Sequence, residues 1–173
     1  MQMKKIAVFL LFFLGVLFSS SSFAANYYVD AVTGNNGNSG SDINPWKTIT
    51  YSLTQITTGD VLNIQNGTYD TANGETFPLD AGSGKHLKAV NTGLATVSAT
   101  SASYIIQGTD YTTLEGIYIS GTNTSYWDIY LGDNGQVLNC YATDTNGGAV
   151  SIGIIKIVSG NKVVGKAYLV VSD

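Results

Sequence analysis

Residues 104–120 read YIIQGTDYTTLEGIYIS, and residues 128–144 read DIYLGDNGQVLNCYATD. The two segments align without a gap at an offset of 24 residues. The aligned identities are Ile105 with Ile129, Gly108 with Gly132, and Leu114 with Leu138. Each segment consists of short β-prone runs separated by turn residues, without a helical pattern. A repeat of this kind is typical of one coil of a parallel β-solenoid.

One apolar position of this repeat recurs through the chain, at spacings of 25, 27, 24 and 26 residues. The residues at this position are Leu62, Leu87, Leu114, Leu138 and Val164. In a solenoid the inward residues of each coil are buried only by the coils above and below, so similar residues recur at similar positions. We therefore predict an all-β fold, a parallel β-helix of about four to five rungs, over residues 61–173.

One amphipathic helix is predicted ahead of the first rung, over Pro45–Ile56, with Asn44 as its N-cap. Its apolar positions at helical intervals are Trp46, Ile49, Leu53 and Ile56. The end of a solenoid exposes unpaired backbone groups, and we expect this helix to cover the N-terminal end. Residues 25–60 would thus form an N-terminal strand, loop and capping helix. At the other end the chain still has strand character, which predicts that missing residues or another chain form the cap.

Residues 1–24 have the layout of a secretory signal peptide. Lys4 and Lys5 form a positive head, the thirteen residues Ile6–Phe18 are all apolar or Gly, and small residues precede a cleavage point after Ala24. A membrane anchor is the alternative, but a spanning helix needs about 20 apolar residues. We predict a secreted or cell-envelope protein with no membrane span after cleavage.

The charge of the chain restricts its partners. Loss of Lys4 and Lys5 with the leader changes the net charge from −4 to −6, and the chain contains no Arg. Such a chain has no electrostatic footprint for phosphate backbones, so nucleic acid is not expected as a partner. Anionic polysaccharide is disfavoured unless a cation bridges the two. The single Cys140 cannot form an internal disulfide, and it is interpreted as a small buried hydrophobe, with an intermolecular bridge as the alternative.

Five short motifs follow one another across residues 26–80. They are YYVD (27–30), PWKTI (45–49), GDVL (59–62), NGTY (66–69) and GETFPL (74–79). This ordered set resembles the uncharacterised N-terminal domain of exported right-handed parallel β-helix proteins of the pectate-lyase-like kind. The resemblance implies a right-handed solenoid and an exported setting. It implies no catalytic mechanism, because none is assigned to that family.

Residues for polysaccharide cleavage are not evident. Pectate lyases of this shape use Ca²⁺ and an Arg base, and this chain has no Arg. A Lys could replace it, and the lysines of the late rungs, which are otherwise interpreted as solvated surface residues, are Lys156, Lys162 and Lys166. The related hydrolases need carboxylates about 5 to 9 Å apart, and their Asn-Thr-Asp, Asp-Asp and His-Gly motifs are absent. We therefore lean against an enzyme.

The remaining acidic residues and the one histidine also have ordinary interpretations. At the 24-residue offset, Asp110 aligns with Asn134 and Asp133 with Thr109, which predicts that carboxylates do not stack. The aspartates interpreted as turn residues are Asp128, Asp133 and Asp144. His86 is interpreted as a surface or turn residue, and the residue counts exclude a metal site built from several His or Cys.

Two features could bind a ligand. The polar segment Thr33–Asp42 is predicted as an extended surface loop, and its oxygen-bearing residues make a weak calcium candidate, with turn structure as the alternative. Those residues are Asp30, Asn36, Asn38 and Asp42. Aromatic residues cluster in the middle rungs, where they could stack on sugar rings or on one another. The cluster comprises Tyr104, Tyr111, Tyr118, Tyr126, Trp127, Tyr130 and Tyr141, and the candidates for glycan stacking are Tyr104, Tyr111, Tyr126, Trp127 and Tyr130.

Three classes of function remain. The favoured one is a non-catalytic β-helix module that binds polysaccharide or presents a surface. The alternative is the N-terminal part of a polysaccharide lyase or hydrolase whose active rungs lie beyond residue 173. The third is a structural or adhesive surface protein that uses the solenoid as a rigid spacer.

Overall fold

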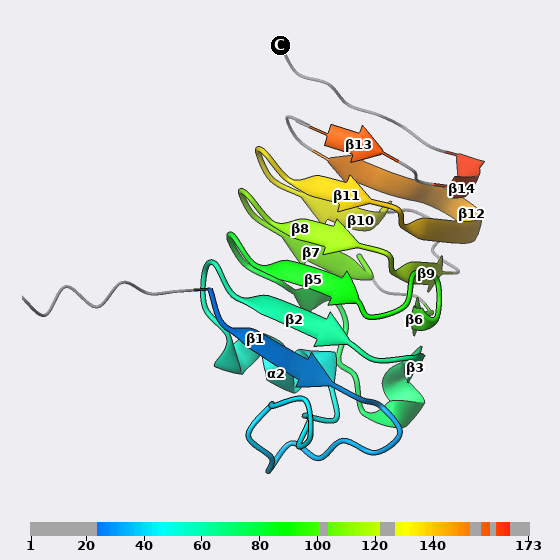
Figure 1. Cartoon of the computed structure of the whole chain (residues 1–173). Helices are drawn as coiled ribbons and strands as arrows, with labels where there is room; N and C mark the ends of the chain where they lie inside the picture. The colour runs from blue at the N-terminus through cyan, green and yellow to red at the C-terminus, as the bar shows by residue number, and fades with distance from the viewer. Residues whose placement is uncertain (1–23, 101–103, 122–126, 153–156, 160–161, 167–173) are drawn as a thin grey trace, which may run out of the picture.

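The computed structural model shows a chain wound into coils that stack on one another, with the first coil at the bottom of Figure 1. The residues that it describes are 24–100, 104–121, 127–152, 157–159 and 162–166. At Trp127 and from Asp144 onward only the backbone is described. In this part of the chain, no helix combines the length and apolar character that crossing a bilayer requires.

One sheet of six strands runs the length of the stack, and its strands follow in the order in which the coils occur in the chain. They are β1 (Asn26–Val29), β2 (Val61–Ile64), β5 (His86–Ala89), β8 (Thr113–Glu115), β11 (Gln136–Leu138) and β13 (Ile157–Ser159). Each neighbouring pair is parallel. The side chains in register on its inner side, all buried, are Leu62, Leu87, Leu114 and Val137.

The other strands form two further faces of the coils. The first face contains β3 (Gly67–Tyr69), β6 (Ala95–Ala99), β9 (Tyr118–Gly121) and β14 (Lys162–Lys166). The second contains β4 (Leu79–Asp80), β7 (Ile106–Gly108) and β10 (Trp127–Leu131). The long strand β12 (Tyr141–Ile152) joins them, because its beginning pairs with β9 and its end with β10. The molecule is a right-handed, three-sided parallel β-helix, as predicted.

The register between the third and fourth rungs differs by one residue from the predicted one. Ile106 pairs with Ile129 and Leu114 with Val137, an offset of 23. The alignment of Ile105 with Ile129, Gly108 with Gly132, and Leu114 with Leu138 was therefore wrong. Because successive side chains of a strand point to opposite faces, this shift places Val137 in the core and leaves Leu138 only half-buried.

The last predicted member of the apolar column is also placed differently. Val164 lies in β14 and pairs with Thr143 of β12, so it belongs to another face. The residue that continues the column beyond Val137 is Val158 of β13. The turn between these strands is shorter than the repeat length assumed from the sequence.

The predicted helix is present but shorter, and α2 covers only Ile49–Gln55. Its N-cap is Thr48, whose hydroxyl accepts a hydrogen bond from the Tyr51 N–H at 3.2 Å, so the expected start at Asn44 was wrong. Trp46 cannot be helical because its backbone pairs with β1. Its N–H donates to the Tyr28 carbonyl at 3.0 Å, and its carbonyl accepts from the Asp30 N–H at 2.8 Å.

The segment between β1 and α2 covers the open edge of the first strand. Besides the pairing of Trp46, the Tyr28 N–H donates to the Gly40 carbonyl at 2.8 Å. The Trp46 indole stacks on Tyr27 with ring centroids 5.1 Å apart, and a Cβ on Gly40 would lie 2.5 Å from that indole. The predicted extended loop is thus a compact cap that satisfies an edge which would otherwise invite pairing with another chain. Figure 1 shows this loop and α2 at the N-terminal end of the stack.

Replacement of Leu87 by Ala will test the apolar column. Leu87 is fully buried between Leu62 and Leu114, so truncation leaves a cavity and should lower the free energy of unfolding by about 2–5 kcal/mol. Urea denaturation followed by circular dichroism measures the change. The control Thr113→Ala, on the outer side of β8, should stay within about 0.5 kcal/mol. Equal effects of the two substitutions would contradict the assignment of inner and outer sides.

Replacement of Glu75 by Gln will test the attachment of α2 to the first rung. The Glu75 carboxylate is buried and accepts hydrogen bonds from the Ile49 and Thr50 N–H groups at 2.7 and 2.8 Å. An amide retains only one acceptor oxygen, so we expect a loss of about 1–3 kcal/mol in urea unfolding. The control Glu115→Gln removes a half-exposed carboxylate and should cost less than about 1 kcal/mol. A smaller loss for Glu75 than for Glu115 would show that the carboxylate does not hold the helix.

Candidate functional site

A groove runs across the outer side of the face made by β6, β9 and β12. The parallel register places Thr96, Tyr118 and Tyr141 on consecutive strands at the same position. Their neighbours Ile119 and Ala142 are buried in the core, so alternation along each strand points these three side chains outward. The sequence thus forms an outward column with one aromatic ring above the other.

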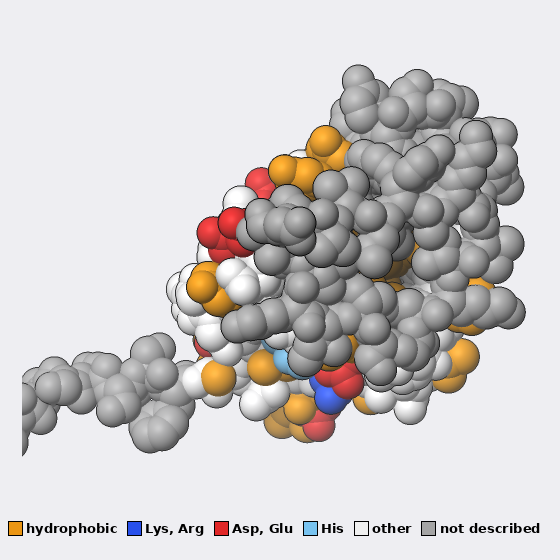
Figure 2. Space-filling view, turned by 90° about the horizontal axis from the view of Figure 1, so that it is seen from above, with side chains coloured by type: hydrophobic (Ala, Val, Ile, Leu, Met, Phe, Trp, Pro, Cys, Tyr) orange, Lys and Arg blue, Asp and Glu red, His pale blue; other side chains and the backbone are white. Residues whose placement is uncertain are grey.

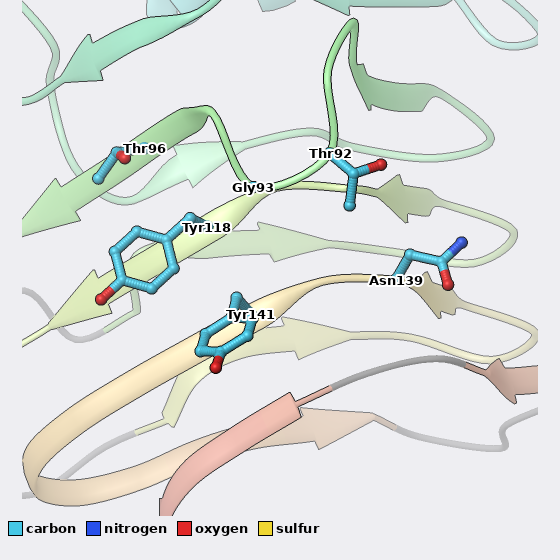
Figure 3. A pocket seen from close by; sticks show the side chains of 6 residues that line it. All are labelled: Thr92, Gly93, Thr96, Tyr118, Asn139 and Tyr141. Carbon is cyan, nitrogen blue, oxygen red and sulfur yellow. The ribbon is translucent and has the colours of Figure 1, made fainter.

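The two tyrosines form one wall of this groove. Their ring centroids are 5.6 Å apart and their planes are inclined by 51°. The Tyr118 hydroxyl lies 3.2 Å from the Thr143 hydroxyl, which fixes the orientation of that ring. Figure 3 shows both rings projecting from neighbouring strands on the same side of the coils. The groove has a volume of about 570 Å³, within the range of small-ligand sites.

The turns between the first and second strands of each coil form the other side of the groove. The lining residues are Thr92, Gly93, Thr96, Tyr118, Asn139 and Tyr141. A Cβ on Gly93 would meet nothing within 4 Å, so this glycine leaves open space between its neighbours. We name this cavity, with these six lining residues, the tyrosine groove.

The lining residues of the tyrosine groove carry no charge. They present two aromatic rings together with the hydroxyls of Thr92 and Thr96 and the amide of Asn139. Aromatic faces pack against apolar C–H surfaces, whereas hydroxyl and amide groups both donate and accept hydrogen bonds. This set suits a ligand that is apolar on its flat faces and hydroxylated at its edges.

Of the five stacking candidates, the structure brings together Tyr104 and Tyr130. Their ring centroids are 5.2 Å apart, and Tyr130 is 43% exposed. Tyr130 follows Gln107 in register on the face of β7 and β10, and the Gln107 amide donates to Asp80 at 3.1 Å. This pair forms a second, flatter aromatic surface beside polar groups.

The other three candidates are not part of that pair. Tyr111 is 65% exposed in a turn with a φ of 61°, and none of the ring contacts between described residues includes it. Tyr126 lies outside the described residues, as does the side chain of Trp127, whose backbone pairs with Gly148. Tyr118 and Tyr141 were not among the stacking candidates, although an alignment at an offset of 23 would have superposed them.

The calcium candidates use most of their oxygens within the N-terminal cap. Asp30 accepts hydrogen bonds from the N–H groups of Val32 and Thr33, which outweigh the opposing effect of burial and lower the pKa of Asp30. The amide oxygen of Asn36 accepts from the N–H groups of Lys47 and Thr48.

The remaining two calcium candidates do not complete a ligand set. Asn38 donates to the Pro45 carbonyl at 2.9 Å, and Asp42 is exposed. In the described ranges, no three His, Cys, Asp or Glu side chains lie close enough together to hold a metal ion. Calcium binding by this loop stays a prediction.

His86 lies in a strand, and its interpretation as a turn residue was wrong. It belongs to β5 and is half-buried, with its Nε2 at 2.9 Å from a Glu115 oxygen, and Lys88 at 3.2 Å from the other oxygen. Burial lowers the pKa of His86, and the Glu115 carboxylate opposes that effect. Figure 2 shows the histidine beside basic and acidic side chains. This arrangement is a surface ion-pair cluster on the outer side of the six-stranded sheet.

The acidic residues of the turns stack, contrary to the prediction. Asp110 and Asp133 occupy corresponding positions in consecutive rungs, and the Asp133 N–H donates to an Asp110 carboxylate oxygen at 3.0 Å. Figure 2 shows acidic side chains gathered at the edge of the coils. Asp128 and Asp144 lie in β10 and β12 rather than in turns, and Asp128 is fully buried. The late lysines fall outside the description of side chains.

The fold and the groove define a parallel β-helix of the architecture found in polysaccharide-cleaving enzymes. A search of solved structures gave a mutant of the PL6 family alginate lyase AlyGC, with a TM-score of 0.55 and 18% identity. The match covers 82% of this chain but only 20% of the lyase. At this identity the similarity concerns the fold alone.

The family is set by a match over residues 32–168 to a family described as "Protein of unknown function (DUF1565)". The chain belongs to this DUF1565 family. No match was found among curated proteins. The resemblance seen over residues 26–80 is thus confirmed for an uncharacterised β-helix family, and the family match extends through the later rungs.

The single cysteine should be chemically inert in the folded protein. Cys140 is 2% exposed, and burial raises the pKa of its thiol to about 11. Since the thiolate is the reactive form, we expect no labelling by a thiol-reactive disulfide reagent at pH 8 over an hour. The same reagent should react within minutes in 6 M guanidinium. Rapid labelling of the native protein, or a reducible dimer on a gel, would contradict this prediction.

Proposed function

We propose that this chain is a non-catalytic, glycan-binding β-helix module that acts outside the cytoplasm. The observation that carries the proposal is the tyrosine groove, in which two outward aromatic rings lie beside hydroxyl and amide groups. Sugars present the same two kinds of surface, because their ring faces carry C–H groups and their edges carry hydroxyls.

The charge of the site favours an uncharged glycan. The lining residues of the groove are neutral, and the chain without its leader would carry a net charge of −6. A polyuronate such as alginate would be repelled by this charge at low ionic strength. We therefore expect a neutral polysaccharide, such as a glucan, to bind in preference to an acidic one.

The expected export supports a polymer ligand. The predicted signal peptide in residues 1–24 places the mature chain among the polysaccharides of the envelope or surroundings. The outward columns of the helix repeat from coil to coil, so that a linear ligand can contact several rungs. Repeated contacts of this kind raise avidity without a deep pocket.

Affinity electrophoresis in gels that contain neutral glucans will test the proposal. The wild-type protein should be retarded, and the double variant Tyr118→Ala with Tyr141→Ala should bind at least about tenfold more weakly, because both aromatic anchors are lost. Urea unfolding of the variant confirms that it remains folded. Migration of the wild-type protein unaffected by any neutral or acidic polymer would overturn the proposal.

Two matched variants locate the site. Tyr111→Ala removes an exposed ring that contacts no other described ring, and it should leave the retardation unchanged. Tyr130→Ala disrupts the flatter pair on the face of β7 and β10. If this substitution abolishes binding and the groove variant does not, the glycan binds at the Tyr104–Tyr130 surface, and the tyrosine groove is not the site.

The lyase alternative rests on the similarity to the fold of an alginate lyase. This chain spans about a fifth of that enzyme, so active rungs could lie in a longer form of the protein. Incubation with alginate and pectate in the presence of Ca²⁺, followed by ultraviolet absorbance of unsaturated products, separates the two functions. Sustained product formation would replace the non-catalytic proposal by the lyase.

A further inference from the structure

The structure holds Ala25 by both of its backbone groups. Its N–H donates to the Asp60 Oδ1 at 3.0 Å, and its carbonyl accepts a hydrogen bond from the Val61 N–H at 2.8 Å. Ala24, one residue earlier, is exposed. Ala25 is therefore the first residue fixed to the β-helix, and the predicted cleavage point lies directly before it.

Asp60 is a buried carboxylate. It is 6% exposed, and its other oxygen accepts hydrogen bonds from the Thr57 N–H and hydroxyl at 2.7 and 3.0 Å. Neither of the ion pairs found between described residues includes Asp60. Lys85 contributes a favourable long-range interaction, but its ammonium donates to the Leu53 carbonyl at 2.9 Å. A buried carboxylate is most stable with a cationic partner in contact.

We propose that the peptide bond between Ala24 and Ala25 is cleaved on export, and that the new α-ammonium of Ala25 forms an ion pair with Asp60 that fastens β1 to the β-helix. A signal peptidase would hydrolyse this bond with one water molecule. Ala24 leaves as a carboxylate, and the amine of Ala25 takes up the proton to become an ammonium. The hydrogen bond already present between Ala25 and Asp60 thereby becomes a charge-assisted one, which is stronger.

The ion pair has a structural consequence for the cap. β1 is the first strand of the six-stranded sheet, and residues 30–46 fold over its outer edge. Cleavage would thus strengthen the attachment of the whole N-terminal cap at the same step that releases the protein. The precursor, which lacks this charge, would have the less stable cap.

The first test is the N-terminus of the exported protein. The full chain is expressed with its own leader in a bacterial host, and the exported form is analysed by intact mass and N-terminal sequencing. We expect residues 25–173. An exported protein that begins at any other residue, or that retains the leader, would overturn the proposal.

The second test removes the charge and keeps the hydrogen-bond donor. Mild acetylation near pH 6.5 modifies the α-amine in preference to lysines, because its pKa is about 8 rather than about 10.4. In urea unfolding at pH 6.5, acetylation should lower the folding equilibrium constant about fivefold. In the Asp60→Asn background, acetylation should have no effect. No effect in the wild type, or the same loss in both backgrounds, would overturn the ion pair.

A pH series provides a readout that needs no substitution. An ammonium paired with a carboxylate has a pKa raised above its unfolded value of about 8, so its stabilisation is complete below that pH and is lost as the pH rises through the folded value. Lys85, the other cation facing Asp60, is present in both forms and cancels in the comparison. The free and acetylated proteins should therefore differ at pH 6.5 and converge near pH 11. A constant difference across the series would contradict the proposal.

Discussion

Parallel pairing of each coil with the next is the constraint on which the rest of the structure depends. No coil has a hydrophobic core of its own, because Leu87 is buried only when Leu62 and Leu114 lie directly below and above it. The same pairing satisfies the backbone N–H and C=O groups of the strands. Packing and hydrogen bonding thus require one register, and a coil that slipped by one residue would lose its apolar column.

This dependence on neighbours makes the N-terminal end the part of the fold that needs separate chemistry. Because no coil lies below β1, other groups must pair with its backbone and cover its apolar side. Trp46 does both, since its peptide groups bond to Tyr28 and Asp30 while its indole stacks on Tyr27. Glu75 then links the start of α2 to the first complete rung. The short motifs around Trp46 and Glu75 that mark this family are therefore the residues of the cap.

The sequence predicted the architecture well, because a repeat of strands and turns allows few other folds. It could not settle the register. Offsets of 23 and 24 residues each superpose three identical pairs between the third and fourth rungs, and Val137 and Leu138 are both apolar. Only alternation of the side chains in three dimensions decides which of the two faces inward. The helix start was misplaced for a similar reason, because pairing with β1 overrides the local preference of Asn44 and Pro45.

The one-residue slip also explains why the candidate site was missed. At an offset of 24, Tyr118 lies opposite Ala142, whereas the actual register stacks it on Tyr141. The stacking requirement applies to inward columns, which must be apolar to bury one another. An outward column meets no such demand, as the mixed residues Val61, His86, Thr113 and Gln136 on another face show. A pair of outward tyrosines beside a groove is therefore not explained by folding alone, and this is the physical reason to look for a ligand there.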